Sequence, residues 1–163
     1  GSVTSEPHSA ISYAACVIDV EVDDETGETR VVRMHQVYGL GRAINPALVE
    51  TQLSGAAVMQ LGFTTTQKME FSAGQCVNPS RADYKIPGIL DIRRGMESEA
   101  VDAVQKSGPF GAKGVGESGT FGVSPAVANA IDDAVGVRIT ELPITHEAVF
   151  RALREKQGKP LED

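Results

Sequence analysis

The sequence has 163 residues, about the length of one domain and enough to bury a hydrophobic core. Its net charge of −7 argues against nucleic acid or an anionic membrane as a partner, because both attract basic proteins. No apolar stretch approaches the roughly 20 residues of a membrane helix, and no signal peptide pattern is present, so we expect a cytoplasmic location.

The residues that commonly bind metal ions are scattered in this sequence. Cys16 and Cys76 lie far apart and form no CxxC motif, so we expect reduced thiols that pack inside the protein. The histidines, His8, His35 and His146, share no spacing typical of metal ligands. The chain alone is therefore not expected to hold a structural zinc ion or an iron–sulfur cluster.

The first elements in chain order form a predicted β-hairpin. Residues 13–22 and 29–38 are rich in β-branched side chains, which is typical of strands. Between them, residues 23–28 (DDETGE) predict a turn in which Gly27 supplies positive φ.

A long helix is predicted to follow the hairpin. Asn45 before Pro46 is an N-cap followed by a first-turn proline, and the helix should run about 20 residues or more. One face of it would carry Leu48, Gln52, Gly55, Met59 and Gly62. That stripe mixes small residues with a glutamine, which leaves two interpretations. Either the glycines pack closely against another element, or they let a ligand approach the backbone while Gln52 hydrogen-bonds it.

Loop signals dominate the middle of the chain. Residues 71–94 hold prolines and turn residues and predict a loop-rich segment. Residues 96–106 fit either a short helix or a strand. The glycine-rich segment 107–125 predicts a loop that needs special backbone geometry.

The last third predicts a helix, a strand and a second helix. Ser124 before Pro125 repeats the cap-and-proline signal and opens a helix that Gly136 should end. Residues 137–143 are predicted to form a short strand, and Thr145 to cap a final amphipathic helix.

These elements predict the α+β fold class, with a small mixed β-sheet that contains the N-terminal hairpin and is flanked by two or three helices. Residues 1–163 should form a single unit, because no repeat or low-complexity linker interrupts the sequence. Residues 1–7 and 155–163 are expected to be flexible.

The segment GAKGVGES (residues 111–118) is the strongest candidate for chemistry. Its glycines remove side chains at nearly alternate positions, so a bulky ligand could lie against exposed backbone N–H groups, and Lys113 could face a phosphate or an oxyanion. Neither the P-loop spacing nor a Rossmann fingerprint is present. Glu117 is either a general base held in a tight loop or an exposed carboxylate in a mobile linker.

Three ordered motifs carry a resemblance to a known family. They are GRAINPALVETQLSGAAVMQLG (41–62), DYKIP (83–87), and GAKGVGES with the segment that follows it (111–154). Together they resemble the C-terminal portion of the molybdopterin-binding (large) subunit of the xanthine dehydrogenase/aldehyde oxidase family of molybdenum hydroxylases. The resemblance covers residues 8–154, so the chain would be one segment of a larger molybdopterin-binding domain.

The resemblance implies roles for particular residues. Glu117 matches the catalytic base that lies beside the molybdenum in enzymes of this family. Lys113, Gly114, Val115 and Gly116 match the loop that lines the pterin and the metal. Gln52 matches a glutamine on the helix that reaches the cofactor, and no residue of the chain is a metal ligand.

The same resemblance implies cofactors and partners. The enzyme would hydroxylate a heterocycle or aldehyde carbon with oxygen from water, using a molybdenum–molybdopterin cofactor. Whether the pterin carries a cytosine dinucleotide is left open. Electrons would leave through 2Fe-2S clusters and FAD on partner subunits, so the expected partners are the remainder of the molybdenum subunit, the iron–sulfur subunit, the FAD subunit and a small-molecule substrate.

Two departures from the family pattern stand in this chain. Ser118 replaces the proline that commonly follows the glutamate, and Met59-Gln60 stands where Gln-Gly is usual. The chain is also several times shorter than the family's subunit, so it is either a fragment or a separately encoded piece. A second hypothesis is therefore a non-catalytic stand-alone assembly or structural module that retains the fold.

Overall fold

The computed structural model describes residues 10–88, 90–91, 95–106 and 108–159. The expectation of flexible ends falls largely on residues 1–7 and 160–163, which lie outside the described residues. Near the C-terminus, helix α4 (His146–Lys156) continues into the segment predicted to be flexible.

A small mixed sheet forms the centre of the fold. Strands β1 (Tyr13–Val22) and β2 (Thr29–Gly39) pair antiparallel, and β5 (Met96–Val101) pairs parallel with β2, from Met34 opposite Met96 to Gly39 opposite Val101. The strand order is β1-β2-β5. The predicted hairpin and the α+β class are thus confirmed, and the ambiguous segment 96–106 contains a strand.

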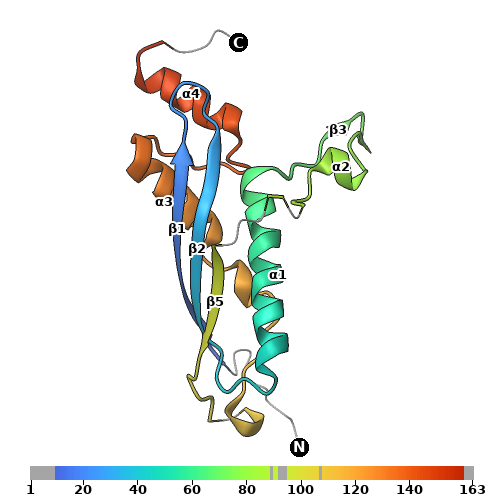
Figure 1. The fold of residues 1–163 in the computed structure, drawn as a ribbon. Coiled ribbons are helices and arrows are strands. Elements are labelled where there is room, and N and C mark those ends of the chain that lie inside the picture. Colours follow the sequence, from blue (N-terminus) through green and yellow to red (C-terminus); the bar gives the residue numbers. More distant parts are fainter. Residues whose placement is uncertain (1–9, 89, 92–94, 107, 160–163) are drawn as a thin grey trace, which may run out of the picture.

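Helices α1 (Pro46–Thr65) and α3 (Val123–Val135) cover one face of this sheet (Figure 1). The core joins Ile18 and Met34 of the hairpin to apolar side chains of α1, α3 and α4. Helix α4 lies across the turn of the hairpin, where Gly27 has φ 75° and a Cβ would meet the backbone of α4. Gly27 therefore serves both the turn and this close approach.

Shorter elements complete the described chain. The two-stranded hairpin of β3 (Phe71–Ser72) and β4 (Gln75–Cys76) and helix α2 (Arg81–Tyr84) extend from the C-terminal end of α1 (Figure 1). The 3-10 turns η1 (Pro109–Gly111) and η2 (Ser118–Thr120) lie within the glycine-rich segment. Among the described residues, no helix is both long enough and apolar enough to cross a membrane.

Local signals set the start of α1, the end of α3 and the start of α4 as predicted. The side chain of Asn45 accepts a hydrogen bond from the Leu48 N–H at 3.2 Å and caps α1. Gly136 ends α3 in the left-handed conformation with φ 65°. The hydroxyl of Thr145 accepts from the Ala148 N–H at 3.1 Å and caps α4.

Two predictions about the last third of the chain are wrong. Residues 137–143 form no strand, because Val137 and Ile144 pack into the core and the Ile144 N–H donates to Thr64 O in α1 at 2.6 Å. Ser124 does not cap α3, since the helix begins at Val123 with Gly122 as its N-cap.

The Ser124 hydroxyl instead joins two helices. Its Oγ accepts from Gln60 Nε2 and pairs with Thr64 Oγ1, both at 2.7 Å. This partly buried polar cluster joins α3 to α1. It also gives Gln60, for which the sequence suggested no function, a structural role.

Candidate functional site

The glycine-rich loop (residues 111–118) runs beside the segment that joins β2 to α1. Gly41 and Ala112 form an isolated β-bridge, and the Lys113 N–H donates to Leu40 O at 3.1 Å. Beyond this bridge the loop turns toward α1. Two segments about seventy residues apart in the sequence are thereby held side by side.

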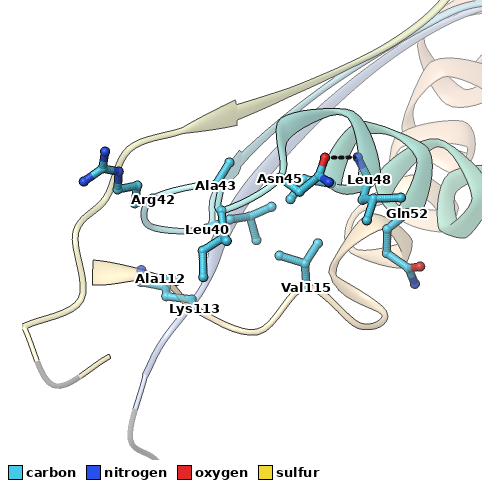
Figure 2. Close-up of a pocket in the computed structure, with 11 residues that line it drawn as sticks. Leu40, Arg42, Ala43, Asn45, Leu48, Gln52, Ala112, Lys113 and Val115 are labelled. Carbon is cyan, nitrogen blue, oxygen red and sulfur yellow. Dashed lines mark hydrogen bonds between the residues drawn. The ribbon is translucent and has the colours of Figure 1, made fainter. Parts of the chain in front are cut away.

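A pocket of about 290 Å³ lies between this loop, the β2–α1 connection and the first turns of α1 (Figure 2). Its lining consists of Leu40, Arg42, Ala43, Ile44, Asn45, Leu48, Val49, Gln52, Ala112, Lys113 and Val115. The pocket therefore brings together three of the predicted site residues: Gln52, Lys113 and Val115. Gly114, Gly116 and Glu117 continue the same loop.

Gln52 ties helix α1 to the loop. Its Nε2 donates to Gly116 O at 2.7 Å, directly before Glu117 in the chain. A Cβ on Gly55, one turn along the helix, would meet nothing within 4 Å, so the backbone there is open to a ligand. Gly62 packs closely against Pro87 instead. The stripe on α1 thus packs closely at Gly62 and leaves an open surface at Gly55, while the Gln52 amide bonds the loop of the chain itself.

The loop presents backbone donors. Among the described residues, no acceptor is hydrogen-bonded to the backbone N–H groups of residues 114–117. Gly114 and Gly116 are exposed, and a Cβ on either would have open space around it. Consecutive free N–H groups in a loop favour anions and carbonyl oxygens.

The Lys113 side chain is directed toward the end of the sheet where β1 begins and β2 ends. Its Nζ donates to Ile11 O at 2.8 Å and to Gly39 O at 3.2 Å. The same ammonium lies 6.0 Å from the centre of the Tyr13 ring. Lys113 therefore fastens the loop to the end of β2 and to the chain just before β1, and it is one of the residues that line the pocket.

Glu117 is exposed, whereas the residues after it are buried. Ser118 and Gly119 are shielded from solvent, and the Glu117 carbonyl accepts from the Thr120 N–H at 3.0 Å and from Thr120 Oγ1 at 2.8 Å. The backbone of Glu117 is thus part of the η2 turn. Its carboxylate forms no ion pair with a described residue.

Sequence reasoning missed two residues of β2 that bind the backbone directly after this loop. Tyr38 and Gln36, on the inward face of β2, are fully buried, and Tyr38 Oη donates to Gly119 O at 3.1 Å. Gln36 Nε2 approaches the same carbonyl at 3.5 Å. The available signal was the alternation Met34, Gln36, Tyr38, which puts a glutamine on the apolar face of a strand.

Burial perturbs two protonation equilibria near this anchor. It raises the pKa of the Tyr38 hydroxyl well above its ordinary value, with a smaller contribution from Cys16. The pKa of the Cys16 thiol is also raised by burial, against a smaller lowering by the Gln36 amide. Both side chains are therefore neutral near pH 7. In the described part of the chain, no group of three or more His, Cys, Asp or Glu could hold a metal ion.

Comparison with known proteins places this geometry in a family. The family described as "Molybdopterin cofactor-binding domain" matches residues 1–93. The chain is 33% identical over 149 residues to a probable xanthine dehydrogenase subunit of Bacillus subtilis, covering 91% of this chain and 20% of that protein. It is 36% identical over 151 residues to the aldehyde oxidoreductase molybdenum-binding subunit PaoC of Escherichia coli, covering 91% of this chain and 21% of that protein.

Solved structures agree with the sequence matches. The aldehyde oxidoreductase of Desulfovibrio gigas superposes with a TM-score of 0.80 at 30% identity, covering 88% of this chain and 15% of that one. The chain thus spans about a fifth of the length of the curated relatives it matches. It belongs to the family of molybdopterin-binding subunits of xanthine dehydrogenases and aldehyde oxidases.

Proposed function

We propose that this chain supplies Glu117 as the general base, and part of the molybdopterin pocket, in an enzyme that hydroxylates a heterocycle or aldehyde carbon with oxygen from water. The proposal rests on family membership. One observation carries it to these residues: the 2.7 Å hydrogen bond from Gln52 to Gly116 O, which joins the pocket helix to the loop immediately before Glu117.

The residues present fit the cofactor. Molybdopterin is anionic and rich in hydrogen-bonding groups, and the loop offers the free backbone N–H groups of residues 114–117 beside a pocket. The open backbone at Gly55 and Gly114 leaves room for a large ligand. Gln52, Val115 and the loop backbone would hold the cofactor, while Lys113 fixes the loop to the sheet. When bound, the molybdenum–pterin group supplies the redox chemistry.

Glu117 would accept a proton at its carboxylate. A general base must lie within hydrogen-bonding distance of the proton that it removes, so its backbone needs a fixed position. The η2 turn and the bond from Gln52 give Glu117 such a position. Its exposure on this chain leaves the carboxylate accessible to a substrate held by the remainder of the subunit.

We further propose, from the family resemblance, that the remainder of the molybdenum subunit covers this face and excludes water. Electrons would leave through 2Fe-2S clusters and FAD on partner subunits in the cytoplasm.

The test is elemental analysis and turnover of the assembled complex, purified with this chain as wild type and as Glu117→Gln. We expect equal molybdenum content and a turnover at least about 10²-fold lower in the variant, because general-base catalysis contributes that much or more. Equal turnover would reject Glu117 as the base. Failure of the wild-type chain to join a molybdenum-containing complex would favour the alternative, a non-catalytic assembly module.

A further inference from the structure

Two backbone carbonyls near Glu117 are each held by a side chain from a different element. Before it, Gly116 O accepts from Gln52 on helix α1 at 2.7 Å. After it, Gly119 O accepts from Tyr38 on strand β2 at 3.1 Å. The short segment that carries Glu117 therefore spans from the helix to the sheet.

The anchor below Gly119 is built from buried polar groups. Tyr38 and Gln36 have no exposed surface, and both aim a donor at Gly119 O. The amide of Gln36 also lies 3.8 Å from Cys16 Sγ, while its Oε1 has no partner among the described residues. An apolar side chain would suit this strand position better for packing alone, so the amide and hydroxyl point to a role beyond filling the core.

The contact also requires a glycine in the η2 turn. A Cβ on Gly119 would lie 2.5 Å from Leu53 O and 2.7 Å from the Ala56 Cβ, so no side chain fits between the loop and α1. The close approach lets the Gly119 carbonyl reach the sheet. Tyr38 and Gln36 thus bind the backbone at the buried Gly119, two residues after Glu117.

We propose that Tyr38 and Gln36 are positioning residues for the base. By donating hydrogen bonds to Gly119 O, they fix the position and orientation of the segment that carries Glu117. This inference rests on the proposed function of Glu117. Neither side chain touches the reacting atoms. Their effect is to restrict the positions that the carboxylate samples, and catalysis is sensitive to shifts of about 1 Å in such groups.

The test uses Tyr38→Phe and the double variant Tyr38→Phe/Gln36→Met in the assembled molybdenum enzyme. Phenylalanine keeps the ring in the core and removes only the donor, so the fold should persist. Tyr84→Phe, which removes a hydroxyl in α2 far from the loop, is the matched control. The measurements are kcat and KM, and hydrogen exchange of the backbone amides of Thr120 and Phe121, which donate to Glu117 O and Ser118 O in the η2 turn.

We expect Tyr38→Phe to lower kcat about tenfold with KM nearly unchanged, because only the placement of the base is disturbed. Amide exchange of Thr120 and Phe121 should rise by about the same factor, since the η2 turn opens more often. The double variant should exceed the single variant in both readouts, and Tyr84→Phe should alter neither.

Unchanged kcat in the double variant would overturn the positioning role, and so would unchanged exchange. Either result would leave the proposed function standing, provided that Glu117→Gln still lowers turnover at least about 10²-fold. Full turnover in Glu117→Gln would instead overturn the proposed function itself, and the positioning of a base with it.

Discussion

The two ends of the sheet are stabilised in different ways. Toward the hairpin turn, a large apolar cluster joins the sheet to α1, α3 and α4. Toward the glycine-rich loop, the buried apolar cluster contains only Tyr38, Leu40 and Leu53 among the described residues, with Val49 and Val115 packed against it. The loop there depends on hydrogen bonds from Gln52 and Tyr38.

This difference separates folding from function. Apolar burial is non-directional and stabilises the core whatever the loop does. Hydrogen bonds are directional, so a few of them can set the position of a loop without covering its backbone donors. The core end should therefore dominate the free energy of unfolding, and the loop end should dominate the binding of a ligand.

The largest expected effect on stability is at the core end. Ile131 in α3 is 1% exposed, so Ile131→Ala should lower the free energy of unfolding by about 2–5 kcal/mol through lost burial and a cavity. Urea denaturation measures this change. Leu48→Ala, at a loop-end position that is 66% exposed, should change it by less than about 0.5 kcal/mol. Equal effects at the two sites would refute the contrast between the two ends.

A smaller loss is expected where the loop meets α1. Gly119→Ala places a Cβ 2.5 Å from Leu53 O, and the resulting displacement should cost about 1–3 kcal/mol of stability. The matched control is Gly114→Ala, whose Cβ would meet nothing within 4 Å and which should be nearly neutral. If denaturation ranks these two variants in the reverse order, the loop does not pack on α1 in solution as the structure shows.

Removing the bond between α1 and the loop should affect dynamics more than stability. Gln52→Leu deletes the 2.7 Å hydrogen bond to Gly116 O, and we expect a loss of about 0.5–1.5 kcal/mol. Amide exchange of Lys113 and Thr120, whose N–H groups donate to Leu40 O and Glu117 O, should accelerate, while exchange in α3 stays unchanged. Gln75→Leu, on the exposed strand β4, controls for the change in side-chain chemistry. Exchange that rises equally in both variants would mean that Gln52 does not hold the loop.

The smallest effect is a loss of stability in alkali. Burial raises the pKa of the Cys16 thiol from its ordinary 9.0, so the folded state holds its proton at a pH where the unfolded chain releases it. Stability is therefore fully present below pH 9.0 and declines as the pH rises from there through the folded pKa. The raised pKa of Tyr38 acts in the same direction at higher pH. Denaturation at pH 8 to 10 should show that the free energy of unfolding declines less steeply with pH for Cys16→Ala than for Cys76→Ala. Identical slopes would exclude Cys16 as a source of the decline.

Much of the fold was predictable because its signals act over a few residues. Asn45 before Pro46, Gly27 in its turn, and Gly136 and Thr145 at helix ends each meet a local requirement for a cap or for positive φ, and each is confirmed. Local requirements can be read without knowing what packs nearby.

The errors occurred where distant contacts decide. Ser124 carries a cap signal, yet its hydroxyl bonds Gln60 and Thr64 on another helix. Residues 137–143 have strand composition, but Val137 and Ile144 are held by the core instead. Propensity is a weak preference that tertiary packing overrides, and no local pattern reports which helix lies opposite.

The candidate site shows the same distinction between local signals and distant contacts. By itself, the sequence determined the family motifs, the open glycine loop and the candidacy of Gln52 and Glu117, because those depend on residue identity and spacing. Only the tertiary structure decided that Lys113 bonds the sheet end and that Tyr38 and Gln36 hold Gly119. Those partners lie 74 to 102 residues apart in the chain. Hydrogen bonds of a few ångströms between such distant residues exist only once the sheet, the helix and the loop have packed together.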